Sequence, residues 1–149
     1  MNNNNYDNLI DPEKDQVFIF SCPANMPLNF AAHLWFICNE KGTVSRWEVL
    51  FGKNQDESWG HLHCDQYLPF EGIEIFPFTK KWHWRGNMLA TVEGETAKKI
   101  MDFIKASKEN YPLLKSYSII GNNSNTYVRW VLKHFPETKV QLPWNAFGK

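Results

Sequence analysis

Residues 121–132 read GNNSNTYVRWVL, in which four polar, turn-forming residues lead without a break into an amphipathic run. The apolar positions from here on recur at the spacing of one helix face, and they are Tyr127, Val128, Val131, Leu132 and Phe135. Basic residues at 133–134 would complement the dipole in the last turn, and Pro136 ends the run. The stretch therefore predicts a helix that begins near Ser124 and packs one face on a core.

Ser124 has two interpretations at the start of this helix. It lies three and four residues before Tyr127 and Val128, so it shares their buried face. Free backbone N–H groups and the positive end of the dipole stabilise an oxyanion at a helix N-terminus, which suits a nucleophilic hydroxyl. The same place suits an ordinary capping serine, because Ser and Asn side chains accept hydrogen bonds from the first turn. Local sequence alone favours the cap.

Composition restricts the class of protein. A chain of 149 residues forms one domain of ordinary size and is long enough to bury a core. Its 16 basic and 16 acidic residues balance and form no basic block, which argues against nucleic-acid binding driven by bulk charge. Seven Trp and eleven Phe fit either an aromatic-lined groove or a large core. The odd set of Cys22, Cys38 and Cys64 predicts reduced, mostly buried thiols.

The first segment, residues 1–15, is polar and predicts a flexible tail before a single domain over residues 16–149. It does not resemble a secretory signal, and no apolar run in the sequence is long enough to cross a membrane. We therefore expect a soluble, cytoplasmic protein. Export by a route that needs no such signal stays open.

The expected elements indicate an α+β domain. Strands are predicted at 17–20, 31–39, 43–51, 72–78 and 117–120, a polar loop at 52–60, and helices at 94–110 and after Ser124. Lys41-Gly42 separates the second and third strands by a tight hairpin turn. We predict a small antiparallel sheet packed on two main helices.

The hairpin register decides which side chains share a face. Pairing Glu40 with Thr43 across the turn places His33 opposite Leu50, and side chains alternate along each strand. One face of the hairpin then carries His33, Trp35, Arg46 and Glu48. Glu48 becomes a diagonal neighbour of His33, within reach of its imidazole. A slip by one residue would reverse the pairing of faces.

Three constellations of residues offer chemistry, and the first joins His33, Glu48 and Ser124. A histidine within hydrogen-bond reach of a serine removes its proton, and a carboxylate on the other ring nitrogen fixes the tautomer. The alternative for His33 is a buried strand histidine with a purely structural hydrogen bond.

The second constellation is a metal site on the extended segment that follows the polar loop. Alternate histidines on a strand point the same way, as zinc ligands often do. Its ligands would be His61, His63 and Cys64 or Asp65, with His83. No paired-cysteine or helical histidine motif accompanies them, so a solvated loop is the favoured interpretation.

The third constellation is a binding groove that would use stacking and cation–π contacts. Its residues would be Trp59, Trp82, Trp84 and Arg85. Ordinary packing of these tryptophans is the favoured alternative.

Five ordered motifs resemble a bacterial family of unknown function, domain-of-unknown-function family 3750. They are His33-x-Trp35, Trp84-Arg85-Gly86-Asn87, Gly94-Glu95-x-Ala97, Gly121-x-Asn123-Ser124-Asn125-Thr126-Tyr127-Val128 and Leu142-Pro143-x-x-Ala146-x-Gly148-Lys149. The resemblance runs from about Ala31 to Lys149. Asn122 departs from the family pattern, which has Pro there, and this affects the turn more than the chemistry. The family carries no settled activity.

A more distant resemblance is to circularly permuted papain-like enzymes, the NlpC-type peptidases and the relatives of lecithin:retinol acyltransferase. These proteins share the order of a strand histidine, a polar residue on the next strand, and an Asn-nucleophile pair that opens a helix. The resemblance implies a permuted papain-like fold, with His33 as base, Glu48 or Arg46 as third residue and Ser124 as nucleophile. Serine where those enzymes have cysteine is a departure, because serine depends on its base for activation. It fits a serine hydrolase or an inactive binding fold.

We therefore expect a hydrolase or acyltransferase that acts on an amide or ester bond through an acyl-Ser124 intermediate. Backbone N–H groups near Ser124 would form the oxyanion site. No cofactor is expected, and the substrate class, small molecule, lipid or peptide, stays open. Substrate contacts are expected from Trp35, Arg46, Trp84, Asn123 and Asn125. The alternatives are a non-catalytic binding module that uses the same aromatic cleft and a zinc-binding protein that uses His61, His63 and Cys64.

Overall fold

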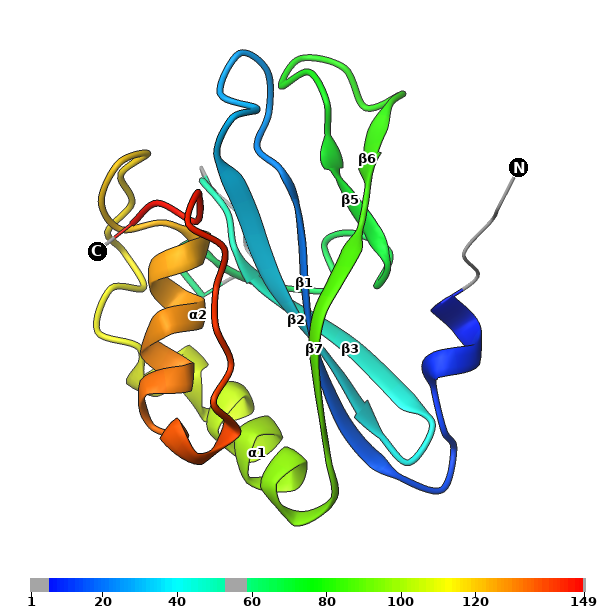
Figure 1. Cartoon of the computed structure of the whole chain (residues 1–149). Coiled ribbons are helices and arrows are strands. Elements are labelled where there is room, and N and C mark those ends of the chain that lie inside the picture. Colours follow the sequence, from blue (N-terminus) through cyan, green and yellow to red (C-terminus); the bar gives the residue numbers. More distant parts are fainter. Residues whose placement is uncertain (1–5, 53–58, 149) are drawn as a thin grey trace.

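The computed structural model describes residues 6–52 and 59–148, and two layers dominate it (Figure 1). An antiparallel sheet in the order β4-β3-β2-β1-β7 carries two helices on one face. The sheet strands are β1 Asp15–Pro23, β2 Ala32–Glu40, β3 Thr43–Val49, β4 Leu62–Cys64 and β7 Asn87–Glu93. The helices are α1 Gly94–Asn110 and α2 Ser124–Lys133. The predicted α+β class, with a sheet packed on two helices, is confirmed.

Alternation along the strands divides the core into two clusters. Leu34 and Phe36 of β2 face the helices and pack in the same cluster as Tyr127 and Val128 of α2. Trp35 and Ile37, the residues between and after them, face the other side of the sheet. Strand β2 is therefore buried on both faces, and its alternate side chains enter two different core clusters. Only one of these clusters contacts the helices.

A second, two-stranded sheet lies over the face that the helices leave open. It pairs β5 Glu71–Glu74 with β6 His83–Arg85, and Ile73 and Trp84 from these strands pack in the far-side cluster. Short 3-10 turns at η1 Tyr6–Leu9 and η2 Pro136–Thr138 complete the elements. The far face is thus covered by β5, β6 and the short 3-10 helix η1 rather than by an α-helix.

The predicted hairpin register is confirmed near its turn. Glu40 pairs with Thr43 and Ile37 with Arg46, and the ladder ends at Phe36 opposite Trp47. Since β2 begins at Ala32 and β3 runs on to Val49, the two strands separate beyond the last pair. The expected pairing of His33 with Leu50 is therefore not formed; the Leu50 amide donates to the carbonyl of His61 instead.

Of the other predicted elements, some agree with the structure and some do not. Helix α1 has the predicted bounds, whereas residues 117–120 form no strand and β7 was not predicted. In the segment expected to be a flexible tail, the Tyr6 ring packs on Phe20 with 5.1 Å between the ring centroids. Residues 1–5, and most of the polar loop expected at 52–60, lie outside the described residues.

The cysteines are free thiols, as expected, with Cys22 and Cys38 buried and Cys64 half-buried. Burial raises the pKa of the Cys22 thiol to about 12. Within the described ranges, no helix is long and apolar enough to cross a membrane.

Candidate functional site

A chain of three buried polar side chains lies on the far face of the hairpin. The Arg46 guanidinium donates from Nε to Glu48 Oε1 at 2.7 Å and from Nη2 to Oε2 at 2.9 Å. The same Oε2 lies 2.7 Å from Nε2 of His33. All three side chains are more than nine-tenths buried. The shared face predicted for these residues therefore holds a bidentate ion pair that continues into a histidine.

The carboxylate of Glu48 fixes the protonation pattern of the His33 ring. Burial alone would raise the pKa of Glu48, but Arg46 and His33 together hold it below its usual 4.5. An ionised carboxylate only accepts hydrogen bonds, so His33 Nε2 carries the proton. In the neutral ring Nδ1 is then the basic nitrogen. Nδ1 makes no hydrogen bond to a described residue, and the His33 residue as a whole is 6 % exposed.

The guanidinium of Arg46 is fixed from every side. Its carbon lies 4.1 Å from the ring centroid of Trp35 and 5.2 Å from that of Tyr67. Its Nη1 donates to the backbone carbonyls of Leu68, at 2.7 Å, and Glu71. The Trp35 ring also stacks on His33. These contacts leave Glu48 one orientation toward His33.

Ser124 is not the cap of helix α2. Asn123 is the N-cap: its side-chain oxygen accepts from the amides of Asn125 and Thr126, and the Thr126 hydroxyl accepts from the Asn123 amide. This is a capping box with Asn and Thr in its two positions. The capping interpretation of Ser124 is therefore wrong, because the cap lies one residue earlier.

The hydroxyl and the backbone N–H of Ser124 make few hydrogen bonds. Its hydroxyl donates to Asn125 Oδ1 at 3.3 Å, a long hydrogen bond, and its side chain is buried. Its own backbone N–H makes no hydrogen bond to a described residue, whereas the amides of Asn125 and Thr126 bond to the cap. Of the N–H groups expected to form an oxyanion site, the one of Ser124 is available.

Asn125 brings the start of α2 to the start of β2. Its Nδ2 donates to the carbonyl of Ala32 at 2.8 Å and to that of Phe147 at 2.8 Å. Ser124 and His33, the chain neighbours of Asn125 and Ala32, therefore lie at the same end of the sheet. They share no hydrogen bond: the His33 ring faces away from the helices, and Ser124 lies on the helix side.

The C-terminal tail closes over the beginning of α2. Asn123 Nδ2 donates to the carbonyls of Ile119 and Phe147, each at 3.0 Å. A side chain at position 148 would stand 2.7 Å from Asn123 Oδ1 and 2.8 Å from Thr126 Oγ1, so the tail needs Gly148 there. The tail motif and the helix-start motif of the sequence thus form one unit.

The residues expected to contact substrate differ in their accessibility. Trp35 and Arg46 are fully enclosed, and Trp35 Nε1 donates to the carbonyl of Pro69 at 2.9 Å. Asn123 and Asn125 are buried in the contacts described above. Trp84 is half-buried and donates from Nε1 to the carbonyl of Ala24 at 3.2 Å. Trp35 and Arg46 are therefore placed to hold His33 and Glu48 rather than to touch a ligand.

The metal constellation is not assembled. Among the described residues no group of three or more His, Cys, Asp or Glu side chains is placed to hold a metal ion. His61 instead stacks on Phe51 and accepts from the amide of Gly52 through Nδ1 at 3.0 Å. His63 is buried, with Nε2 enclosed against Gly52.

The tryptophan groove is not assembled either. Trp59 stacks on Trp47 on the helix side of the sheet, while Trp84 packs in the far-side cluster. Two surface hollows, of about 500 and 550 Å³, lie away from Ser124 and His33. One is lined by Tyr67, Leu68 and neighbouring residues, the other by residues of α2 and the tail.

Fold and site together define a class: an α+β domain in which a capped helix start lies at the same end of the sheet as a strand histidine held by a buried Arg–Glu pair. The chain belongs to the family described as protein of unknown function (DUF3750), whose model matches residues 14–149. The match confirms the family resemblance drawn from the motifs and extends it to the first strand. Comparison with curated proteins and with solved structures gives no match.

Proposed function

We propose that this protein hydrolyses or transfers an acyl group from an ester or amide, with Ser124 as nucleophile and His33 as general base. The observation that carries the proposal is the tautomer of the His33 ring, which the hydrogen bond to Glu48 fixes. Glu48 accepts from Nε2, which leaves Nδ1 as the basic nitrogen, and β2 carries this ring at the end of the sheet where α2 begins. A base whose second nitrogen is held by a carboxylate is the arrangement that activates a hydroxyl.

The first half of the reaction would form an acyl-enzyme. Because β2 lies between the His33 ring and the helix, the reaction needs a shift of the helix start past the end of β2, in which the Ser124 hydroxyl leaves its long hydrogen bond to Asn125 and reaches His33. The Ser124 oxygen attacks the carbonyl carbon of the substrate while its proton passes to His33 Nδ1. The backbone N–H of Ser124 stabilises the resulting oxyanion. The bond to the leaving group then breaks, and the leaving group takes the proton from His33.

The second half would return the enzyme to its starting state. Water or an acceptor alcohol or amine attacks the acyl-Ser124 carbonyl and gives its proton to His33. The Ser124 oxygen leaves and recovers that proton. Glu48 and Arg46 act as positioning residues throughout, because they touch His33 or each other and not the reacting atoms.

The arrangement is consistent with a permuted papain-like relationship, in which a nucleophile opens a helix and a histidine comes from a neighbouring strand. The link between Asn125, which follows Ser124, and the carbonyl of Ala32, which precedes His33, supports this proposal.

A fluorophosphonate probe tests the proposal, because it phosphonylates only serines that a base has activated. Wild-type protein should become labelled on Ser124, as located by mass spectrometry, and should hydrolyse activated esters such as p-nitrophenyl acyl esters. Ser124→Ala and His33→Ala should abolish both signals, while Ser116→Ala, at an exposed serine of the preceding loop, should retain them. An unlabelled, folded wild-type protein would overturn the proposal.

The Ser124–Asn125 hydrogen bond favours a second candidate, a binding module without catalysis. A serine held permanently by Asn125 is not a nucleophile. In that case neither probe labelling nor ester turnover is expected, and ligand binding should survive the Ser124→Ala substitution.

A further inference from the structure

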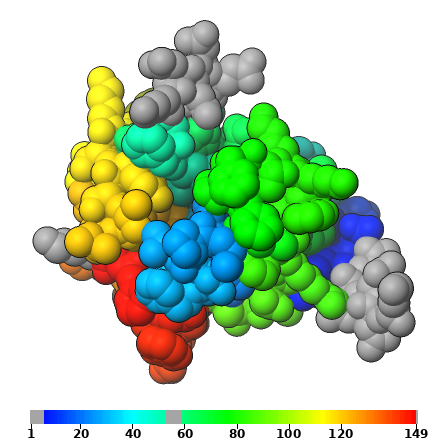
Figure 2. Space-filling model, turned by 90° about the horizontal axis from the view of Figure 1, so that it is seen from above, coloured from blue at the N-terminus to red at the C-terminus, as the bar shows by residue number. Residues whose placement is uncertain are grey.

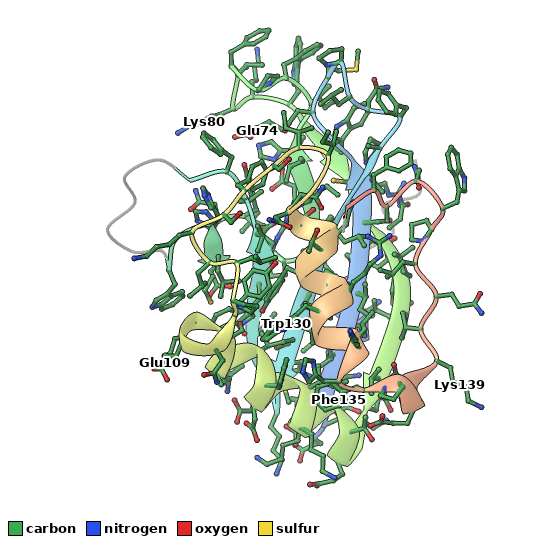
Figure 3. All side chains as sticks on the ribbon, turned by 90° about the vertical axis from the view of Figure 1, so that its left-hand side faces the viewer. Glu74, Lys80, Glu109, Trp130, Phe135 and Lys139 are labelled. Atoms are coloured by element: carbon green, nitrogen blue, oxygen red, sulfur yellow. The ribbon has the colours of Figure 1, made fainter. Side chains whose placement is uncertain are left out.

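The C-terminal tail, residues 143–148, lies where the two elements that carry the candidate catalytic residues come together. Figure 3 shows the chain after Lys139 running back along α2 to the start of that helix. Seen from above in Figure 2, the tail, in red, lies against the segment that precedes β2, in blue, and the segment that precedes α2, in yellow. We name the surface that the tail covers the tail site; its contacts come from the starts of β2 and α2.

The tail site binds the main chain of the tail. Each of the four successive carbonyls of residues 145–148 accepts a hydrogen bond from the tail site. The first accepts from the backbone N–H of Ala32 at 2.9 Å, and the second and fourth accept from the Arg129 guanidinium. Strand β2 and helix α2 therefore hold the same short segment from its two sides.

The third of these carbonyls, that of Phe147, is held by two side-chain amides that flank the candidate nucleophile. Asn123 Nδ2 donates to it at 3.0 Å, and Asn125 Nδ2 donates at 2.8 Å. Ser124 lies between these two residues, and its own backbone N–H makes no hydrogen bond to a described residue. Amide donors that converge on a carbonyl oxygen beside a nucleophile are the components of an oxyanion site.

The side chains of the tail contribute less to this contact than its main chain. The Trp144 ring is 85 % exposed and the Phe147 ring 42 % exposed. Only Ala146 is fully buried in the tail, and Gly148 is needed because a Cβ there would stand 2.7 Å from Asn123 Oδ1. Peptide ligands are recognised in the same way, since main-chain hydrogen bonds supply affinity and a few restricted positions supply specificity.

We propose that the tail site is a binding site for peptides, which the tail occupies in the resting chain. A peptide ligand replaces the tail and presents its own carbonyls to the same donors. It needs a small residue in the place of Ala146 and glycine in the place of Gly148, whereas the position of Phe147 between them accepts other residues.

This inference deepens the proposed function and, for its chemistry, rests on it, because it makes the substrate a peptide. The carbonyl that takes the place of Phe147 is the one that Ser124 attacks. The Ser124 oxygen bonds to the carbonyl carbon, the peptide C–N bond breaks, and the leaving amine takes the proton that His33 removed from Ser124. Asn123 and Asn125 hold the carbonyl oxygen during this step. The tail blocks the site until a peptide displaces it.

Binding of a synthetic peptide to full-length variants tests the site. The probe is fluorescein-labelled PWNAFG, the sequence of residues 143–148, and fluorescence anisotropy measures its affinity. In the wild type the attached tail competes at an effective concentration on the order of millimolar, so the probe should bind weakly. Ala146→Phe should expel the tail, because this side chain is fully enclosed, and should raise the affinity for the probe at least about tenfold.

Two further variants accompany Ala146→Phe. Gly148→Ala disturbs the tail by a single methyl group, so it serves as a milder second variant and should also raise the affinity. Trp144→Ala changes an exposed ring of the same tail and should bind the probe as weakly as wild type.

Variants of the peptide identify what the site recognises. On the Ala146→Phe protein, a peptide with Ala in place of its Trp should bind like the parent peptide. Peptides with Phe in place of Ala, or with Ala in place of Gly, should not bind. Absence of binding by folded Ala146→Phe and Gly148→Ala proteins would overturn the peptide site, and so would equal binding of all these peptides.

Labelling of Ser124 by the fluorophosphonate probe separates this inference from the proposed function. Proteins with a released tail should be labelled faster than wild type, and the peptide should slow that labelling. Ser124→Ala combined with Ala146→Phe should still bind the peptide. Peptide binding by a protein that is never labelled would reject the proposed catalysis and keep the peptide site, and labelling without peptide binding would do the reverse.

Discussion

The side-chain amide of Asn125 donates to the carbonyl of Ala32 across 93 residues of sequence, with 2.8 Å between nitrogen and oxygen. This single contact sets where the α2 helix starts relative to the β2 strand. The second hydrogen of the same amide bonds to Phe147 in the tail. One asparagine thus positions three segments that are distant in sequence, and it stands directly between the candidate nucleophile and the body of its helix.

Asn125→Ala should therefore destabilise the domain more than a typical surface change. Two carbonyls lose their donor, one of them buried, which costs roughly 1–3 kcal/mol in unfolding free energy. Urea denaturation measures this loss. Asn122→Ala, three residues earlier, removes only an exposed hydrogen bond to Ser116 and should cost far less. Equal effects of the two substitutions would mean that the contact with Ala32 contributes little.

Substitutions at Asn123 and Ser124 should separate stability from activity. Asn123→Ala removes the cap and should lower the unfolding free energy by about 0.5–2 kcal/mol. Ser124→Ala removes one long hydrogen bond and should change it by less, while abolishing probe labelling. Thermal unfolding together with labelling measures both effects. A large loss of stability in Ser124→Ala, with ester turnover retained, would make the serine structural.

The buried Arg46–Glu48 pair should respond very differently to single and double substitution. Glu48→Ala leaves an enclosed guanidinium without its carboxylate, which costs roughly 3–5 kcal/mol. Replacing both partners by apolar residues, Arg46→Met with Glu48→Leu, avoids an unpaired buried charge and should be less destabilising than Glu48→Ala. A double-mutant cycle on unfolding free energies measures this. Additive losses from the two sites would show that the pair is not coupled.

Glu48→Gln addresses the positioning of His33. Glutamine presents an amide in place of the carboxylate, so the preferred tautomer of His33 is no longer imposed. Labelling of Ser124 should slow by at least about tenfold, and the pH profile of labelling should shift. A labelling rate and profile like those of wild type would remove Glu48 from the proposed mechanism.

Local patterns predicted the parts of this fold that depend on neighbouring residues. The apolar stripe and its ends marked α1, and the Lys41-Gly42 turn fixed the register that places His33, Arg46 and Glu48 on one face. Strand β7 was missed because it is a sheet edge and largely exposed, which gives its sequence little of the signature of a buried strand. The cap was misplaced by one residue, since Asn123 and Ser124 are equally good caps.

Local sequence patterns did not predict which distant segments come into contact. The acceptors for Asn125 and for Arg46 are backbone carbonyls, such as that of Ala32, and a carbonyl carries no residue-specific signal. The two faces of β2 were predicted, but the side of the sheet that α2 covers was not. For that reason the sequence placed His33 and Ser124 in one constellation without showing that β2 lies between the His33 ring and the helix.

His63 gives a test of how acid affects stability. Burial is the main cause that lowers the pKa of His63 below its usual 6.5, and its Nε2 is enclosed without a partner. The unfolded chain then binds a proton more readily than the folded one, so unfolding free energy should fall as pH drops below about 6.5. Urea denaturation at a series of pH values measures this slope.

His63→Gln should flatten the slope between pH ~6.5 and pH ~5, above the range in which the lowered pKa of Glu48 matters. Near pH ~8, where His63 is neutral in both states, the difference between variant and wild type should be constant, which serves as the control. An unchanged slope in His63→Gln would assign the acid sensitivity to other groups.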